Sequence, residues 1–189
     1  MSAQDSKLFV ISGPSGAGKG TLVTRVRERR SNLGLTVSAT TRAPRKGEVD
    51  GVNYFFLTRE EFDRRVANGE FVEWAEVHGN CYGTLVSEVQ SKLASGSSLI
   101  LEIDVQGALQ VKGRFPEAVL IFIKPPSLEV LRERLVGRGT ETPETIELRM
   151  ANAADELALA DRYDDVVVND DLDRATDELV RVLDMHERI

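Results

Sequence analysis

The amino-acid sequence predicts an α/β fold built on a parallel sheet with helices on both faces. Two observations predict it: short runs of apolar and β-branched residues recur along the chain, and segments of helical periodicity separate them. Parallel strands buried on both faces need crossover helices between them, so this alternation indicates a doubly wound core. The 189 residues, of which 41% are hydrophobic, suffice for a single domain.

Four apolar runs are the expected core strands, at residues 8–11, 98–104, 118–123 and 165–169. Helices are expected where apolar residues recur at spacings of three and four, near residues 18–26, 128–135, 146–160 and 172–182. Residues 136–142 are polar and contain two glycines before Pro143, so a small lid is expected at about residues 134–150.

The segment at residues 34–95 breaks this rhythm and is predicted to be a mixed α/β insertion in a core formed by residues 1–33 and 96–189. Its helix is expected to begin at Thr58, because Thr58 and Glu61 have the Thr-x-x-Glu spacing of a capping box. The predicted elements of the insertion are strands at residues 52–57, 71–77 and 80–85, and a helix at residues 58–67.

Composition argues against several classes of function. The formal net charge of −7 disfavours nucleic acid and anionic membranes as partners. No apolar run approaches the roughly 20 residues of a membrane-spanning helix, and the first residues lack the pattern of a secretory signal. Cys81 is the single cysteine, which suits a reducing compartment. We therefore expect a cytoplasmic protein, and no oligomeric state is predicted.

A glycine-rich segment directly after the first strand is the strongest motif. Gly13, Gly18 and Lys19 match the G-x-x-x-x-G-K pattern in the order strand, loop, helix. Glycines let backbone N–H groups turn toward a phosphate, and the helix N-terminus and the lysine add positive charge. The residues expected to bind the phosphates of a nucleotide are Gly13, Pro14, Ser15, Gly16, Ala17, Gly18, Lys19, Gly20 and Thr21.

This motif leaves two questions open. Gly20 stands where such loops usually carry Ser or Thr, so the hydroxyl that contacts Mg²⁺ is not assigned, although Thr21 follows directly. The loop alone also fits GTPases, motor ATPases and small-molecule kinases equally.

Charged residues elsewhere suggest further sites. Arg42 and Arg45, beside Pro44, have a spacing that can place two guanidinium groups around one phosphate, or they form a solvated basic loop. Glu102 and Asp104, at the end of an expected strand, either approach Mg²⁺ or cap the next helix.

Residues 38–48 (SATTRAPRKGE) and 50–56 (DGVNYFF) closely resemble the guanylate kinase family. The likeness runs from about Lys7 to the last helix, through residues 70–75, 80–84, 102–107, 138–141 and 168–172. The resemblance implies a P-loop core, an inserted GMP-binding region and a small lid. It also implies transfer of the ATP γ-phosphoryl group to GMP, and to dGMP as a further acceptor, with Mg²⁺ required.

The resemblance implies a role for individual residues. Glu73 would accept hydrogen bonds from the guanine N1–H and 2-amino groups, and the alternation of residues 71–77 places it on one face with Phe71 and Ala75. The implied GMP-binding residues are Ser38, Arg42, Arg45, Tyr54, Glu73, Tyr82, Thr84 and Asp104. The implied catalytic residues are Lys19, Arg42, Arg138 and Arg149. Arg138 and Asn169 are implied to bind ATP as well. Thr21 and Glu102 are implied to bind Mg²⁺, either directly or through a water molecule.

No general base is evident, because His78 and His186 are isolated in the sequence. The reaction would need none, since the second pKa of the GMP phosphate group is about 6 and its oxygen atoms are largely ionised at pH 7. Two alternatives remain: a P-loop kinase acting on a ribose phosphate, and a non-catalytic guanylate-kinase-like module that binds phosphopeptides. Five residues argue against the first, namely Ser38, Arg42, Arg45, Tyr54 and Glu73. The intact Lys19 argues against the second.

Overall fold

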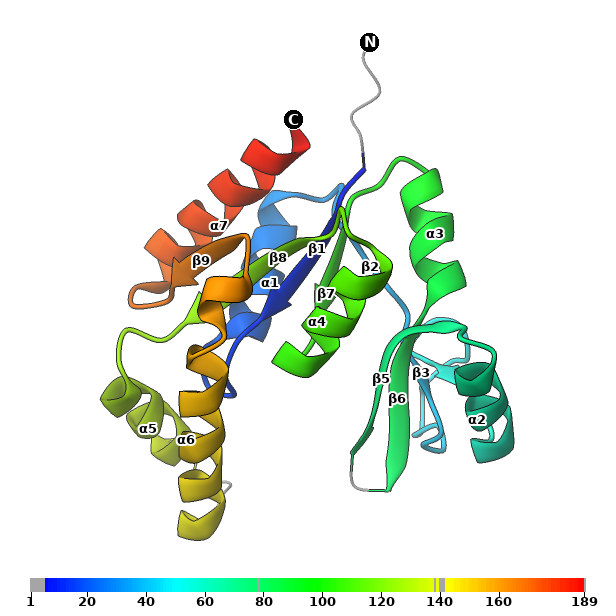
Figure 1. Cartoon of the computed structure of the whole chain (residues 1–189), viewed down its shortest axis with the longest axis horizontal. Helices are drawn as coiled ribbons and strands as arrows, with labels where there is room; N and C mark the ends of the chain where they lie inside the picture. Colours follow the sequence, from blue (N-terminus) through cyan, green and yellow to red (C-terminus); the bar gives the residue numbers. More distant parts are fainter. Residues whose placement is uncertain (1–5, 78, 138, 140–141, 189) are drawn as a thin grey trace.

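A five-stranded parallel sheet forms the core of the computed structural model, which describes residues 6–77, 79–137, 139 and 142–188 (Figure 1). Its central strand, Leu8–Ser12, is buried along its whole length and pairs with a parallel strand on each side. The strand order is β2 (Gly34–Leu35), β7 (Leu99–Glu102), β1 (Leu8–Ser12), β8 (Val119–Lys124) and β9 (Asp165–Val168). This confirms the predicted parallel core.

Helices cover both faces of this sheet, as predicted. Alternate residues of β1 belong to different hydrophobic clusters, one on each face of the sheet. Phe9 and Ile11 pack with one set of helices, and Leu8 and Val10 pack with the other. The first set is α1 (Lys19–Arg29) and α7 (Leu172–Glu187), and the second is α3 (Val86–Ala94) and α4 (Val105–Arg114).

A second sheet lies beside the core (Figure 1). Its strand order is β4 (Phe55–Phe56), β3 (Ala39–Thr40), β6 (Asn80–Leu85) and β5 (Phe71–Val77), and α2 (Arg59–Ala67) packs against it through Phe62. As predicted, the Thr58 hydroxyl accepts from the Glu61 N–H at 3.1 Å. The Glu61 carboxylate, however, accepts from Arg64 and Arg65, so the reciprocal half of the expected capping box is replaced by ion pairs.

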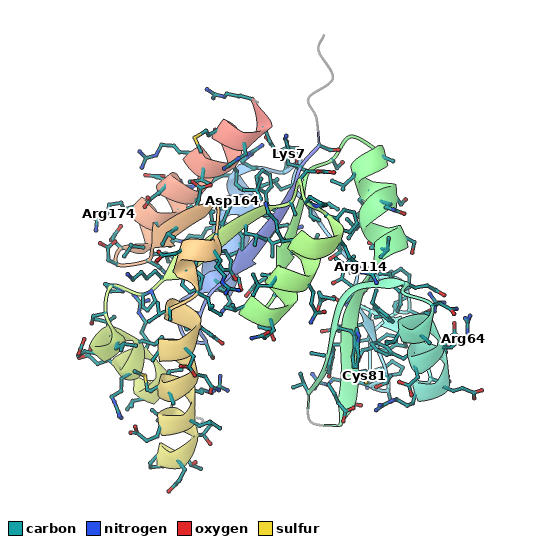
Figure 2. The ribbon with its side chains drawn as sticks, viewed as in Figure 1. Lys7, Arg64, Cys81, Arg114, Asp164 and Arg174 are labelled. Atoms are coloured by element: carbon teal, nitrogen blue, oxygen red, sulfur yellow. The ribbon has the colours of Figure 1, made fainter. Side chains whose placement is uncertain are left out.

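Contacts from the core hold this second sheet in place. Arg114 of α4 donates from Nη1 to the Gly69 carbonyl oxygen at 2.6 Å (Figure 2). Val72 of β5 packs in the same cluster as Val89 and Val111 of the core helices. β2 and α3 fall within the range expected for the insertion, yet β2 pairs with β7 and α3 packs on the main sheet.

A β-bulge at Val72 changes the direction of the side chains along β5. Phe71 pairs with Leu85 but Glu73 pairs with Thr84, so two steps along β5 match one step along β6. Phe71 therefore stacks on Phe62 of α2, with ring centroids 4.3 Å apart, while Glu73 faces the opposite side. The prediction that Glu73 shares a face with Phe71 is wrong, because it assumed unbroken alternation.

Two expected strands are shorter than predicted. Residues 51–53 form a turn, closed by the Asn53 side chain accepting from Val49 N–H at 2.8 Å, and only Phe55–Phe56 are extended. The strand expected at residues 98–104 ends at Glu102, because Asp104 caps α4 by accepting from Gly107 N–H at 2.7 Å.

Two helices in the C-terminal half of the chain pack against each other (Figure 1). They are α5 (Leu128–Gly137) and α6 (Pro143–Leu157), and Leu131, Leu135, Ile146 and Ala153 form their shared core. α6 begins at Pro143, where the Thr142 side chain accepts from Thr145 N–H, and it ends before a short 3-10 turn, η1 (Ala160–Arg162). Among the described residues, no helix combines the length and the apolar character needed to cross a bilayer.

Candidate active site

The loop between β1 and α1 wraps around the Lys19 side chain. Lys19 Nζ donates to the carbonyl oxygens of Gly13 at 2.5 Å and Pro14 at 3.1 Å. Gly13 and Gly18 have φ angles of 137° and 90°, in the region that favours glycine. A Cβ on Gly13 would lie 2.2 Å from the Ile123 carbonyl oxygen, so this turn requires glycine. The motif predicted from the sequence therefore forms a glycine-dependent cradle.

Side chains from distant segments hold the cradle. Asn169, after β9, donates from Nδ2 to the Ala17 carbonyl oxygen at 2.8 Å and is 5% exposed. Arg149 of α6 donates to the Ser15 hydroxyl, and Arg134 of α5 donates to the Asn169 carbonyl oxygen at 2.8 Å. Arg149 and Asn169 thus lie at the cradle, whereas Arg138 falls outside the described residues.

A cavity of about 450 Å³ opens between α1 and the second sheet. Pockets of this size accommodate small-molecule ligands. Five residues predicted from the sequence line it, namely Gly20, Ser38, Tyr54, Thr84 and Glu102. The cavity therefore joins the first turn of the cradle helix to the face of the second sheet that carries Glu73.

Glu73 is held by its neighbour across the β5–β6 hairpin. The Thr84 hydroxyl donates to Glu73 Oε1 at 2.8 Å. Burial raises the pKa of Glu73, the Thr84 hydrogen bond opposes this, and the negative charge of Asp104 raises the pKa further. Thr84 therefore fixes the direction of a carboxyl group whose protonated form is favoured by burial.

Arg42, Tyr54 and Tyr82 gather at another part of this site. The Arg42 guanidinium lies over the Tyr54 ring, 5.4 Å from its centroid, and the rings of Tyr54 and Tyr82 meet edge to face at 6.2 Å. A hydrogen bond with Glu48 is the main cause that raises the pKa of Arg42, and Tyr82 makes a smaller contribution in the same direction. Cys81, next to Tyr82, is buried on the α2 side instead (Figure 2), where burial raises the pKa of its thiol.

The positive charge of Lys19 acts on two carboxyl groups, Glu102 and Glu156. Burial raises the pKa of Glu102, and the charge of Lys19 partly opposes this. Glu156 of α6 has its pKa raised by burial in the same way, again with Lys19 opposing. A Cβ on Gly20 would lie 3.5 Å from Glu102 Oε1, so this carboxylate lies beside the first turn of α1. Asp104, by contrast, is used as a helix cap.

Several residues of the site were not predicted from the sequence. Thr24, Arg27, Leu35 and Thr36 also line the cavity. Gly20, Thr24 and Arg27 are spaced four and three residues apart along α1, so they share one helix face, and this periodicity after the glycine-rich loop was a usable signal. Glu156 had no such signal, since its position relative to Lys19 depends on where α6 packs.

The fold and the cradle define a P-loop nucleotide-binding protein: a central parallel strand, a glycine-rich turn and a helix that begins with lysine. The chain belongs to the guanylate kinase family, whose family model matches residues 5–186.

Individual relatives agree with this assignment. The chain is 57% identical over 178 residues to a guanylate kinase of Gloeobacter violaceus, covering 94% of this chain and 87% of that one. It is 51% identical over 183 residues to a guanylate kinase of Halalkalibacterium halodurans, covering 97% of this chain and 90% of the relative. The crystal structure of guanylate kinase from Anaplasma phagocytophilum matches with a TM-score of 0.71 at 37% identity, covering 96% of this chain and 86% of that one.

Proposed function

We propose that this protein transfers the γ-phosphoryl group of ATP to GMP, giving ADP and GDP. One observation carries the proposal: a single cavity is lined both by Gly20 and Glu102, beside the phosphate cradle, and by Ser38, Tyr54 and Thr84, beside Glu73. Two nucleotides can therefore meet in one site. Membership of the guanylate kinase family supports the choice of acceptor.

The triphosphate of ATP would lie in the loop of residues 13–18, with Lys19 and Thr21 at the start of α1. Backbone N–H groups and the helix N-terminus favour anions there, and Lys19 is a mobile cation beside them. Arg149 would contact the same phosphates, because it already reaches Ser15. We assign Arg138 and Asn169 to the ATP side by family resemblance.

Guanine recognition would rest on Glu73, with Thr84 beside it. A carboxylate can accept from the guanine N1–H and 2-amino groups together, whereas adenine presents a lone pair at N1 and would leave the buried carboxylate unpaired. Unpaired polar groups of this kind can reject a wrong substrate by ~10⁴-fold. The GMP phosphate would bind a set of donors comprising Ser38, Arg42, Arg45, Tyr54 and Tyr82, with Asp104 near the acceptor.

The residues at the cradle fit a magnesium ion brought in by the nucleotide. Mg²⁺ usually takes one or two carboxylates, substrate phosphates and several waters. Glu102 beside the cradle helix would supply such a carboxylate, and Thr21, which is exposed in the first turn of α1, would lie near the ion. In the described part of the chain, no group of three or more His, Cys, Asp or Glu side chains is placed to hold a metal ion. When bound, Mg²⁺ would neutralise charge on the transferring phosphoryl group.

Charge repulsion is the main obstacle to this reaction, because two anionic nucleotides must meet in line. Two unit charges 4 Å apart repel by about 4 kcal/mol at an effective dielectric constant of 20. Lys19 and Arg149 on the ATP side and Arg42 on the GMP side would offset this repulsion and keep the two nucleotides aligned for transfer. We further propose that about residues 134–150, from the end of α5 into the first half of α6, form a lid. We also propose that residues 34–95, which include the second sheet, form the GMP-binding insertion. We assign the activity to purine nucleotide metabolism in the cytoplasm.

A coupled assay of ADP formation tests the proposal, with GMP, dGMP, AMP and UMP as acceptors and with EDTA as a metal-free control. We expect GMP to be the preferred acceptor, dGMP to be accepted, and EDTA to abolish turnover. Equal or better turnover of AMP would refute the assignment of the acceptor. A titration with ATP separates the enzyme from a phosphopeptide-binding module, since such a module would not bind ATP.

A further inference from the structure

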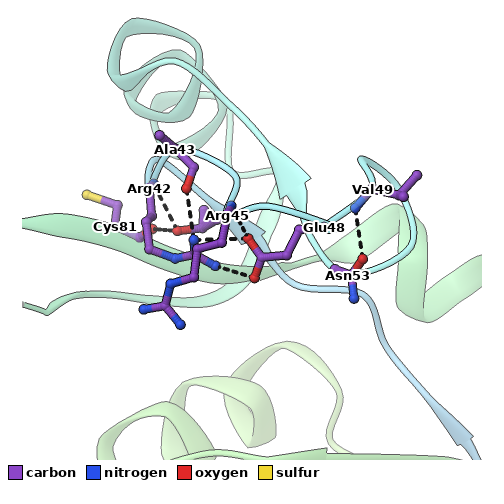
Figure 3. A network of polar contacts seen from close by, with 8 residues as sticks. Arg42, Ala43, Arg45, Glu48, Val49, Asn53 and Cys81 are labelled. Carbon is purple, nitrogen blue, oxygen red and sulfur yellow. Dashed lines mark hydrogen bonds and ion pairs between the residues drawn. The ribbon is translucent and has the colours of Figure 1, made fainter.

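Glu48 forms a two-point ion pair with Arg42 (Figure 3). Glu48 Oε1 accepts from Arg42 Nη2 at 2.8 Å, and Glu48 Oε2 accepts from Arg42 Nη1 at 3.0 Å. The pair is largely shielded from solvent, with side-chain exposures of 16% for Arg42 and 19% for Glu48. The two side chains are only six residues apart, and both belong to the loop that follows β3.

The remaining contacts of Glu48 fix the loop around this pair. Glu48 Oε2 also accepts from Arg45 N–H at 2.6 Å, and the Glu48 N–H donates to the Arg45 carbonyl oxygen at 3.0 Å, closing a turn (Figure 3). Hydrogen bonds from Arg42 and from the Arg45 backbone keep the pKa of Glu48 below its ordinary value. Glu48 is therefore ionised at neutral pH and joins both arginines of the loop.

Counting donors shows which edge of the Arg42 guanidinium is used by neither Glu48 nor Ala43. A guanidinium has five N–H donors. Two Nη hydrogens serve Glu48, and the second Nη1 hydrogen serves the Ala43 carbonyl oxygen at 2.8 Å. Neither Glu48 nor Ala43 uses the Nε–H and the outer Nη2–H, which point in parallel along one edge, the geometry that receives a phosphate or carboxylate in bidentate fashion. The Tyr82 hydroxyl also interacts with the guanidinium group. Tyr54 lies against the guanidinium face and Tyr82 lies nearby.

We infer that Glu48 is a positioning residue for the acceptor phosphate: by occupying the end of the Arg42 guanidinium, it directs the Nε and Nη2 edge toward that phosphate. This inference rests on the proposed function. Arg42 alone is a long side chain with several rotamers, so a carboxylate that fixes it lowers the entropy lost on binding. Glutamine at position 48 would turn an NH₂ group toward one Nη donor and break the two-point contact.

The test compares Glu48→Gln with Glu76→Gln. Glu76 is a matched control, because it accepts from Arg59 Nη1 at 3.0 Å on the same second sheet but lies outside the cavity lining. For Glu48→Gln we expect the Kd and KM for GMP to rise about 10-fold or more, with the KM for ATP and the affinity for guanosine, which lacks the phosphate, changed less than 2-fold. Glu76→Gln should match the wild type in all of these.

A double-mutant cycle with Arg42→Lys adds a measurement that a general loss of structure would not produce. If Glu48 acts through Arg42, the double variant should bind GMP no more weakly than Arg42→Lys alone. An unchanged Kd for GMP in Glu48→Gln, a parallel loss of guanosine affinity, or full additivity in the cycle would overturn the inference. If the wild-type protein did not phosphorylate GMP, the proposed function would be wrong. The titration of GMP binding would still test the role of Glu48 in that case.

Discussion

Thr84 of β6 donates its hydroxyl hydrogen to Glu73 Oε1 of β5 at 2.8 Å, across a hairpin whose bulge at Val72 turns Glu73 away from Phe71. Without the bulge, Glu73 would point into the apolar cluster with Phe62. The bulge therefore decides that this carboxylate faces the cavity side, and Thr84 fixes the direction of its oxygen atoms. Bulges are known to re-aim a side chain next to active sites.

Replacing Glu73 by glutamine should remove the preference for guanine. Glutamine presents an NH₂ group where the carboxylate would accept from guanine, so one or two charge-assisted hydrogen bonds are lost. We expect kcat/KM for GMP to fall about 100-fold, with kcat/KM for AMP changed only a few-fold, in the coupled ADP-formation assay. Glu76→Gln, on the same strand, is the control. An unchanged ratio of GMP to AMP turnover would show that Glu73 does not read the base.

The same variant should not lose stability at neutral pH. Burial raises the pKa of Glu73 in the folded state above its ordinary value of 4.5, so the folded protein binds this proton more tightly than the unfolded chain. The ionised carboxylate therefore costs stability once the pH rises above the folded pKa, and protonation removes this cost at low pH. We expect Glu73→Gln to have an equal or higher free energy of unfolding than the wild type at pH 7. Urea titrations at pH 7 and at pH 4 check this, since any advantage should shrink at the lower pH.

Sequence patterns predicted the parts of the site that depend on local chemistry. The cradle follows from the glycines and Lys19, because few other sequences allow backbone N–H groups to converge in this way. The core strands follow from apolar runs that are buried on both faces. The acceptor residues came from resemblance to a family, since Arg42 by itself indicated a phosphate site no better than a solvated loop.

Features that depend on long-range pairing were not predictable from the sequence. The bulge at Val72 is set by how β5 pairs with β6. Strict alternation of side chains along the strand therefore placed Glu73 on the same face as Phe71, which is wrong. From the sequence, Asp104 could approach Mg²⁺ or cap the next helix, and its hydrogen bond to the first turn of α4 became visible only in the structure. Glu156 reaches the surroundings of Lys19 only because α6 packs there.

Gly18→Ala should damage the cradle. Gly18 caps α1 with φ 90°, and a Cβ there would lie 2.3 Å from Asn169 Nδ2, the atom that holds the Ala17 carbonyl. We expect the free energy of unfolding to fall by about 2 kcal/mol and ATP binding to weaken more than 10-fold. Gly113→Ala is the control: it lies in α4 with no atom within 4 Å of the added Cβ, and it should gain about 0.5–1 kcal/mol. Urea unfolding and an ATP titration measure both effects, and equal behaviour of the two variants would contradict this account of the loop.

Arg30→Met should destabilise the protein far more than Arg25→Met, although both remove an ion pair to α7, one from the residue that directly follows α1 and one from within α1. Arg30 pairs with Asp184 and with Glu187, whose side chain is only 2% exposed, whereas the pair of Arg25 and Asp173 has exposures of 40% and 75%. Replacing Arg30 removes a positive charge that contacts a buried carboxylate, and we expect this to lower the free energy of unfolding by about 3 kcal/mol. An exposed ion pair contributes only about 0–1 kcal/mol. Urea unfolding at pH 7 in low and high salt distinguishes them: the loss in Arg30→Met should persist in high salt, because a buried pair is screened little. Equal losses in the two variants would show that α7 is held to the cradle helix by its apolar face alone.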